Sequence, residues 1–414
     1  MDKEFFTRNR NRLADKLKDE SVLLLFAGDA PYKSADEQYP FIPNRNFYYI
    51  TGIDEKKVIF LMSKINGKLS EGLFIERPDP VMAKWVGATI SADEAARKSG
   101  IESIEYLDQF KDVIGSILNR NKVENIYLDL ERQEIGTSAT ESQDFAKMIV
   151  ENYPYIKIKN IYYDIAELRM IKSDEEIQLI RKAIEITNEG INNMMDNTTP
   201  GMMEYEIEAY FDFVLKKNGI NNRAFETIAG SGINGTVLHY SSNNRRTKDK
   251  ELILFDLGAQ YKYYNADISR TFPVNGKFTN RQKQVYNIVL KANKAVEEAA
   301  KPGIRYRELN EIAKEVLAEG CMELGLIEDK DELSGYYFHG VSHYLGLDTH
   351  DVGLTDVELK PGMVITNEPG LYIEEEEIGI RIEDDLLITE YGCENLSKDI
   401  IKSVEDIETY MNKN

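Results

Sequence analysis

Apolar residues in the first part of the chain occur in short runs that alternate with segments of helical periodicity. The short runs have the length and composition of β-strands, and they cover Val22–Ala27, Val58–Met62, Gly72–Ile75 and Ile126–Leu130. The segments with apolar residues on one helical face predict helices, and they cover Glu4–Leu17, Asp108–Arg120 and Asp144–Asn152. This alternation predicts an α/β domain with a mixed sheet and flanking helices.

One further helix in this part is marked at both ends. Ser91 and Glu94 have the spacing of a capping box, and Gly100 stands where a left-handed residue ends a helix. No glycine-rich loop of the kind that holds phosphate groups occurs here, so nothing in this part supports nucleotide binding.

The pattern changes near residue 170, where longer helices begin. Ser173 and Glu176 form a capping box that opens a helix to about Met195. Three more helices are predicted: one from Thr199-Pro200 to Lys217, ending at Gly219, one from Thr279 with Gln282 in the capping-box position, and one over Arg307–Ala318. Strand-rich segments that contain every histidine follow each pair of helices. Two helices and then strands, twice over, predict a pseudo-duplicated α+β domain, with domain ranges 1–170 and 171–414.

Composition narrows the class of protein. The formal charge of -21 and the pI of about 4.8 disfavour nucleic acid and anionic membranes as partners. Cys321 and Cys393 offer neither a disulfide framework nor metal-ligand spacing. The charged first residues lack the apolar core of a signal peptide, and no run approaches the roughly 18 apolar residues of a membrane span. We therefore expect a cytoplasmic protein.

Two acids stand in strand-like sequence near residue 260. Asp256 is the only acid in the apolar run Ile253–Gly258, and Asp267 belongs to the alternating run Ala266–Phe272. A hairpin centred on Tyr261-Lys262 would place the two acids directly opposite each other, with Cβ atoms about 5 Å apart. Like charges at that distance are destabilising unless a cation lies between them. A bulge or a longer loop would change this register.

A second pair of acids repeats the arrangement. Met363–Glu368 and Gly379–Glu383 are strand-like, and the acidic run Glu374–Glu377 between them predicts a solvated turn. The hairpin would place Glu368 opposite Glu383. A lone histidine is more often a core or surface residue than a ligand, but the two pairs of acids favour a metal-ligand role for His343.

Four carboxylates and one imidazole form a hard, oxygen-rich donor set. It suits Mn²⁺, Fe²⁺ or Co²⁺ better than a structural zinc site, which prefers thiolates and imidazoles. Two divalent ions would neutralise the carboxylates and lower the pKa of a water between them toward neutrality, giving a hydroxide nucleophile. A site lined by acids disfavours phosphate esters, so amide hydrolysis is preferred. No Gly-x-Ser-x-Gly elbow occurs, and neither cysteine is near a histidine in sequence, so a covalent nucleophile is not expected.

The acids and histidines stand in five sequence blocks: Asp256-Leu257-Gly258, Asp267–Phe272, His339–Gly346, Asn367–Tyr372 and Gly379–Asp384. Together these blocks resemble the motifs of the pita-bread metallopeptidases (peptidase family M24), which include methionine aminopeptidase, Xaa-Pro dipeptidase and Xaa-Pro aminopeptidase. The resemblance covers nearly the whole chain. It implies a pita-bread fold for the second domain and two divalent metal ions, with Mn²⁺ favoured and Co²⁺, Fe²⁺ or Zn²⁺ as alternatives.

The resemblance also implies how the metal ions are held. Asp256 would bind one ion and His343 with Glu368 the other, while Asp267 and Glu383 would bridge them. Glu368 would in addition move a proton between the bridging water and the leaving group.

Other residues would serve the substrate in such an enzyme. His239, in the block Gly235–Tyr240, would line the substrate site, and His350 would stabilise the oxyanion at the scissile carbonyl. His339 would contact the pocket on the proline side. Arg381 and Tyr372 would position the substrate or support the ligands, although a strand ion pair and a core aromatic are the structural alternatives.

The N-terminal domain distinguishes branches of this family. Methionine aminopeptidases lack it, whereas prolidases, aminopeptidases P and creatinases have it. Tyr39-Pro40, Asn46–Gly52 and Trp85–Gly87 resemble the aminopeptidase P version, but Gln38 stands where many relatives have Asp. In oligomeric relatives the corresponding tryptophan reaches a neighbouring active site, so Trp85 is an expected substrate contact and a homodimer or homotetramer is the expected assembly.

We therefore predict a dinuclear metal-dependent exopeptidase that removes the N-terminal residue from peptides with proline in the second position. The Xaa-Pro bond calls for a specialist because it is a tertiary amide without an N–H. The closest alternative is an Xaa-Pro dipeptidase, which the sequence separates poorly from the first. A metal-free amidinohydrolase like creatinase and a non-catalytic binding protein share the fold, but both usually lack ligands that are intact here.

Overall fold

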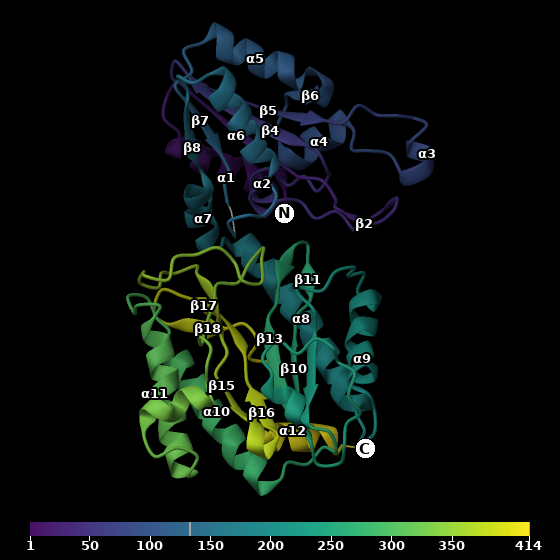
Figure 1. Cartoon of the computed structure of the whole chain (residues 1–414), viewed down its shortest axis with the longest axis vertical. Helices are drawn as coiled ribbons and strands as arrows, with labels where there is room; N and C mark the ends of the chain where they lie inside the picture. The colour runs from purple at the N-terminus through teal and green to yellow at the C-terminus, as the bar shows by residue number, and fades with distance from the viewer. Residues whose placement is uncertain (132–133, 414) are drawn as a thin grey trace. The chain divides into compact units, whose positions relative to one another are not determined.

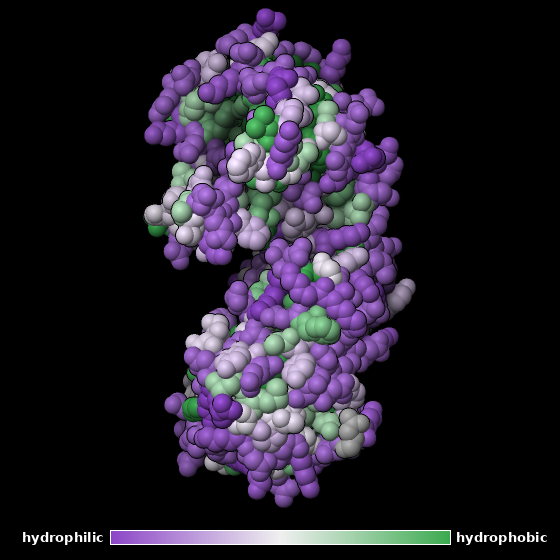
Figure 2. Space-filling model, turned by 90° about the vertical axis from the view of Figure 1, so that its right-hand side faces the viewer, coloured by the Kyte–Doolittle hydropathy of each residue, from purple (hydrophilic) through white to green (hydrophobic). Residues whose placement is uncertain are grey.

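The computed structural model describes residues 1–131 and 134–413, and the chain divides into two compact units, Met1–Arg169 and Met170–Asn414. Most of the face drawn in Figure 2 is hydrophilic, in line with the abundance of charged residues in the chain. Among the described residues, no helix combines the length and the apolar character needed to cross a membrane.

The first unit is built on a six-stranded sheet with the order β6-β5-β4-β1-β7-β8 (Figure 1). Its strands are β1 (Ser21–Phe26), β4 (Ile59–Ile65), β5 (Lys68–Ile75), β6 (Ile104–Tyr106), β7 (Asn125–Leu128) and β8 (Lys157–Asn160). Strand β1 runs antiparallel to β4 and parallel to β7. The sheet is therefore mixed, which confirms the predicted α/β architecture.

Helices accompany this sheet, and those near residues 4–17, 91–100, 108–120 and 144–152 lie where the sequence pattern predicts them. They are α1 (Lys3–Lys16), α2 (Arg45–Thr51), α3 (Ala83–Val86), α4 (Ala92–Ser99), α5 (Phe110–Arg120), α6 (Glu141–Asn152) and α7 (Tyr162–Met170), with a 3-10 turn η1 (Leu107–Gln109) and a ribbon of β2 (Tyr32–Ser34) with β3 (Glu37–Gln38). The buried Ile114 of α5 and Ile149 of α6 pack in one core with Val22 and Ile126 of the sheet. Ser91 caps α4, and Gly100 ends it with a φ of 76°, as predicted.

The second unit contains two helix pairs, each followed by strands. Helix α8 (Asp174–Asn197) packs with α9 (Glu204–Lys217), and α10 (Asn280–Ala299) packs with α11 (Glu308–Glu323). In Figure 1, α8 and α9 lie on one side of the central strands, and α10 and α11 lie on the other. The predicted duplication of an α+β arrangement is confirmed.

The strands of this unit form two small sheets and two ribbons. The first pair of helices is followed by β9 (Ile228–Ser231), β10 (Leu252–Leu257), β11 (Gln260–Tyr261), β12 (Tyr264–Asn265) and β13 (Ile268–Pro273). The second pair is followed by β14 (Val364–Asn367), β15 (Gly370–Ile373), β16 (Ile378–Arg381), β17 (Asp384–Ile388) and β18 (Cys393–Asn395), and then by α12 (Val404–Met411). The sheets have the orders β13-β10-β9 and β14-β17-β18, and the ribbons pair β11 with β12 and β15 with β16. Short 3-10 turns complete the unit: η2 (Gly232–Thr236), η3 (Lys330–Gly335) and η4 (Glu374–Glu376).

Two helix starts agree with their capping boxes, and one predicted start is wrong. Ser173 caps α8 and Thr279 caps α10, each in a reciprocal capping box. Helix α9, however, begins at Glu204 and not at Thr199-Pro200. Gly201 has a φ of 95°, outside the helical range, and its amide donates to the carbonyl of Thr247. This turn delays the helix past the proline.

Candidate active site

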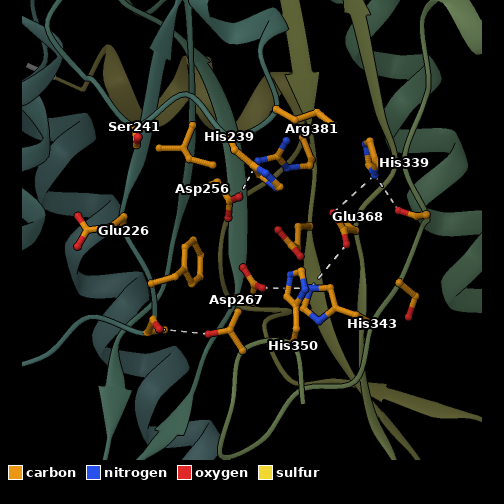
Figure 3. A pocket seen from close by; sticks show the side chains of 18 residues that line it. Glu226, His239, Ser241, Asp256, Asp267, His339, His343, His350, Glu368 and Arg381 are labelled. Carbon is orange, nitrogen blue, oxygen red and sulfur yellow. Dashed lines mark hydrogen bonds and ion pairs between the residues drawn. The ribbon is translucent and has the colours of Figure 1, made fainter. Parts of the chain in front are cut away.

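A cavity of about 730 Å³ in the second unit collects the predicted acids and histidines (Figure 3). Its polar lining includes Asp256, Asp267, Glu368, Glu383, His239, His339, His343, His350 and Arg381. Its apolar lining includes Phe225, Ile228 and Leu238. The histidines lie in the segments that connect strands, whereas the acids stand on or beside the two hairpins. The fold therefore brings together all five residues predicted to hold metal.

Two predicted substrate contacts are not among the described residues that line this cavity. Tyr372, on β15, is buried, and its hydroxyl bonds with His339 and Arg381. Tyr372 thus holds two residues that line the cavity, His339 and Arg381, without lining it itself. Trp85 lies in the first unit on α3, where it is 81% exposed.

The first acid-bearing hairpin has a different register from the predicted one. Asp256 pairs with Ser269 across β10 and β13, so the prediction that it faces Asp267 is wrong by two residues. The turn is centred on Lys262 and Tyr263, whose positive φ values of 49° and 71° are typical of a tight two-residue hairpin. Because side chains alternate between the two faces of a strand, a shift of two keeps both acids on one face. Both still line the cavity.

The second hairpin has the predicted register. Asn367 pairs with Asp384 across β14 and β17, and Gly370 pairs with Arg381 across β15 and β16. Glu368 and Glu383 lie between these two pairs of strands. Both pairs have the same register, and in that register Glu368 stands opposite Glu383. The predicted opposition of this second pair is confirmed.

His343 points one ring nitrogen at the acids. The donor atoms of Asp267, His343 and Glu383 all lie within 4.8 Å of one another. His343 Nε2 lies 3.2 Å from Asp267 Oδ2 and 3.7 Å from Glu368 Oε1. Its Nδ1 lies 3.0 Å from the Tyr344 carbonyl, an acceptor, so Nδ1 carries the proton in this contact. A backbone partner on the second nitrogen is the usual arrangement of a histidine that binds metal through the first.

Asp256 carries a buried oxygen that lacks a protein partner. Its Oδ2 accepts a bond of 2.7 Å from Arg381 Nη2. Its Oδ1 is buried without a hydrogen-bond partner among the described residues. A buried carboxylate oxygen of this kind is costly unless a cation or water satisfies it. The donor set therefore fits a metal ion on the Asp256 side of the cavity.

Repulsion between the buried acids shifts their protonation. Burial, together with the charge of Glu383, raises the pKa of Asp267 and of Glu368 well above their usual values. Burial and the charge of Asp256 raise the pKa of Glu383 to about 7. Bound cations would offset this repulsion and keep the carboxylates ionised. The electrostatics of the site, like its unpartnered oxygen, therefore fit divalent metal ions.

His339 is held as a neutral ring. Its Nδ1 lies 2.7 Å from the Gly340 carbonyl, and its Nε2 lies 2.8 Å from the Tyr372 hydroxyl. Since a carbonyl only accepts, Nδ1 donates to it and Nε2 accepts from the hydroxyl. Burial lowers the pKa of His339 to about 4, so the ring is uncharged at pH 7.

Two supporting residues beside the acids are absent from the predicted site. Ser269 Oγ donates to Glu383 Oε2 at 2.7 Å and accepts from Arg381 Nε at 2.7 Å. Asp385 is fully buried, and its Oδ2 accepts from the backbone amide of Asp267 at 3.3 Å. Ser269 has a signal in the sequence, because it stands two residues after Asp267 and so on the same strand face.

A third supporting residue, Glu204, has no such signal. It is fully buried at the start of α9, and its carboxylate accepts from the amide and hydroxyl of Ser231 and from the Tyr240 hydroxyl. It thereby holds the segment that carries His239. Only the folded chain brings these residues together.

Ser269→Ala is expected to weaken metal binding and activity by about 10–100-fold, because the side chain orients Glu383 and Arg381 at once. Titration of the metal-free chain with Mn²⁺, alongside peptide hydrolysis, measures both effects. Ser241→Ala is the matched control, since Ser241 also lines the cavity but has no bond to the acids among the described contacts. Equal metal affinity in the two variants would contradict the role given to Ser269.

A duplicated α+β unit that aims four carboxylates and one histidine into a single cavity defines a metalloenzyme. The chain belongs to metallopeptidase family M24, which matches residues 178–390, and its first unit matches the N-terminal domain of aminopeptidase P over residues 6–127. It is therefore a hydrolase of the metalloaminopeptidase class with the pita-bread fold. Membership in this family implies divalent metal ions.

Individual relatives cover the chain almost completely. The Xaa-Pro aminopeptidase of Escherichia coli (strain K12) is 34% identical over 434 residues, covering 98% of this chain and 97% of that protein. A solved structure from Bacillus anthracis, described as a candidate aminopeptidase P, is 56% identical with a TM-score of 0.99 and covers 100% of this chain and 99% of its own. Aminopeptidase P from E. coli with the inhibitor Pro-Leu is 33% identical with a TM-score of 0.92, covering 99% of this chain and 98% of its own.

Proposed function

We propose that the chain removes the N-terminal residue from peptides whose second residue is proline, with two divalent metal ions at the site. The observation that carries the proposal is the convergence of Asp256, Asp267, His343, Glu368 and Glu383 on one cavity. The substrate class is supported by the similarity to the Xaa-Pro aminopeptidase of E. coli and to its structure with Pro-Leu.

The five residues are proposed to share the two ions. Asp256 would hold one ion, His343 and Glu368 the other, and Asp267 and Glu383 would contact both. The oxygen-rich donor set favours Mn²⁺, with Co²⁺, Fe²⁺ or Zn²⁺ as alternatives. When bound, such ions supply Lewis-acid activation of a water and of the scissile carbonyl.

Glu368 is the proposed proton carrier. Its Oε1 lies 3.7 Å from His343 Nε2 at the proposed metal site, so this carboxylate is placed to take a proton from a water held there and to give it to the departing proline nitrogen. His350 and His239 line the same cavity. Their ring N–H groups are proposed to donate to the oxygen of the scissile carbonyl as negative charge develops there.

Proline recognition is assigned to the uncharged part of the site. The Xaa-Pro bond has no N–H, so its recognition depends on shape and apolar contact. His339, neutral because burial lowers its pKa to about 4, offers a flat uncharged ring on the proline side. Phe225, Ile228 and Leu238 add apolar surface to the cavity.

Cleavage of matched peptides tests this function. The Mn²⁺-loaded chain is expected to release alanine from Ala-Pro-Ala, and to cleave Ala-Ala-Ala at least about tenfold more slowly. Mass spectrometry of the products measures both rates and identifies the bond that is cut. Cleavage of the dipeptide Ala-Pro without cleavage of Ala-Pro-Ala would replace the proposal by the Xaa-Pro dipeptidase. No cleavage of any peptide would contradict it.

A homodimer or homotetramer is the proposed assembly. Val81, Met82, Trp85 and Val86 are all at least half exposed on or beside α3. Clustered exposed apolar side chains are typical of an interaction surface. Light scattering should therefore give a mass at least twice that of one chain, and Trp85→Ala should reduce association. A monomer at micromolar concentration would contradict this assembly.

A cytoplasmic location stays a prediction.

A further inference from the structure

A buried ion pair stands beside the active-site segment and takes no part in the chemistry proposed above. Lys172 Nζ lies 3.0 Å from Asp351 Oδ2, and both side chains are 1% exposed. Lys172 directly precedes the capping residue of α8, and Asp351 directly follows His350 in the sequence. Neither residue is among the described residues that line the cavity.

Asp351 organises the segment 344–351 from within. Its amide donates to the Tyr344 carbonyl at 2.8 Å, and its Oδ1 accepts from the amide of Asp348 at 3.4 Å. A Cβ at Gly346 would lie 2.3 Å from Asp351 Oδ2 and 3.0 Å from Lys172 Cε. The segment is therefore closed tightly on the ion pair, and only glycine fits at position 346 without displacement.

The same segment is attached to both acid-bearing hairpins. The backbone amide of Asn265, two residues before Asp267, donates to the Gly346 carbonyl at 3.0 Å. The amide of Leu345 donates to the carbonyl of Val364 on β14 at 3.1 Å. These two backbone bonds anchor Leu345 and Gly346 to the strands, so loss of the ion pair is expected to displace the end of the segment that carries His350 and not the metal-binding acids.

His350 itself depends on the segment for its position. Its ring lies 4.1 Å from the His343 ring, centroid to centroid, and Figure 3 shows the two rings side by side. Among the described residues, no hydrogen bond holds the His350 ring. The residue is exposed, so burial does not fix it either. Its place over the acids follows from the backbone that Asp351 holds.

We infer that Lys172 and Asp351 form a positioning pair that fixes His350 at the reacting carbonyl. This inference rests on the proposed function, because it assumes that His350 serves the cleavage reaction. Both side chains are buried, so replacing Lys172 by an uncharged residue removes the cation that faces the buried Asp351 carboxylate, which is a costly change in the protein interior. The pair thus ties the start of α8 to the segment that carries His350.

The test measures whether the effect of Lys172 passes through His350. Lys172→Met is compared with the unsubstituted chain, and the same substitution is made in a His350→Ala background. The assay follows kcat and KM for Ala-Pro-Ala with Mn²⁺, together with metal content per chain. We expect Lys172→Met to lower kcat about 100-fold in the unsubstituted background, but about twofold or less where His350 is already absent.

Metal content and KM should change little in these variants. Lys283→Met is the control for loss of a lysine ion pair, since Lys283 and Glu408 are 34% and 23% exposed; its kcat should equal that of the unsubstituted chain. If Lys172→Met does not fold, Asp351→Asn replaces it, because asparagine keeps an acceptor for the Asp348 amide but loses the charge.

The possible failures are distinguishable. Equal fold-losses in the two backgrounds would show a general structural role and overturn the inference. Full activity of His350→Ala would overturn the role of His350 and the inference with it. An unsubstituted chain that does not cleave Ala-Pro-Ala would instead overturn the proposed function on which the inference rests.

Discussion

Glu383→Ala is expected to abolish turnover and to remove bound metal. Glu383 is fully buried and is proposed to contact both ions, and its donor atom lies within 4.8 Å of those of Asp267 and His343. Loss of the ions removes several kcal/mol of transition-state stabilisation, and about 4 kcal/mol corresponds to roughly a 10³-fold loss in kcat. Hydrolysis of Ala-Pro-Ala and metal analysis of the purified variant measure the two effects.

Glu374→Ala is the matched control for this substitution. Glu374 is a glutamate of the same hairpin, but it lies exposed in the turn between β15 and β16. Its removal should leave kcat and metal content within about twofold of the unsubstituted chain. Full metal content and activity in Glu383→Ala would refute the assignment of Glu383 as a ligand.

Arg270→Met is expected to cause the largest loss of stability among the substitutions considered. Arg270 and Asp384 form an ion pair at 2.7 Å in which both side chains are fully buried. Arg270 also donates to the backbone carbonyls of Ser269 and Glu383, beside the metal-binding acids. Its loss leaves the buried Asp384 with Lys402 as its remaining cationic partner and removes the donor of two backbone carbonyls. Breaking a buried pair costs about 3–5 kcal/mol, and because Lys402 remains we expect the low end of this range. Urea denaturation of the metal-free chain measures this loss.

Arg281→Met provides the comparison for the loss of an arginine. Arg281 pairs with Glu376, and these side chains are 33% and 27% exposed. A solvent-screened pair contributes about 1 kcal/mol or less, so this variant should unfold close to the unsubstituted chain. Equal destabilisation by the two substitutions would contradict the structural role of the Arg270–Asp384 pair.

Local rules were sufficient for the features that short stretches of sequence determine. Reciprocal caps at Ser173 and Thr279 start their helices where predicted, because the side chain and the amide that it satisfies are three residues apart. The alternation of side chains between the two faces of β10, β13 and the second hairpin correctly predicted that the acids share one face, which lines the cavity. The prediction for the first hairpin was wrong in register but right about this face, because the error was an even number of residues.

Features that depend on distant residues were beyond the reach of the sequence pattern. The start of α9 depends on the contact of Gly201 with Thr247, and the Lys172–Asp351 pair joins residues 179 positions apart. Glu204 likewise gains its role only when the fold brings Ser231 and Tyr240 to it. Their common property is burial of a charged or polar group beside a partner that no local motif specifies.

Metal stoichiometry measured together with peptide cleavage tests the central claim most directly. The metal-free chain is titrated with Mn²⁺ in a calorimeter, and release of alanine from Ala-Pro-Ala is followed at each step. We predict that two ions bind per chain and that activity rises with their binding. Undiminished cleavage after exhaustive removal of metal, or no cleavage with both ions bound, would contradict a two-metal peptidase built on Asp256, Asp267, His343, Glu368 and Glu383.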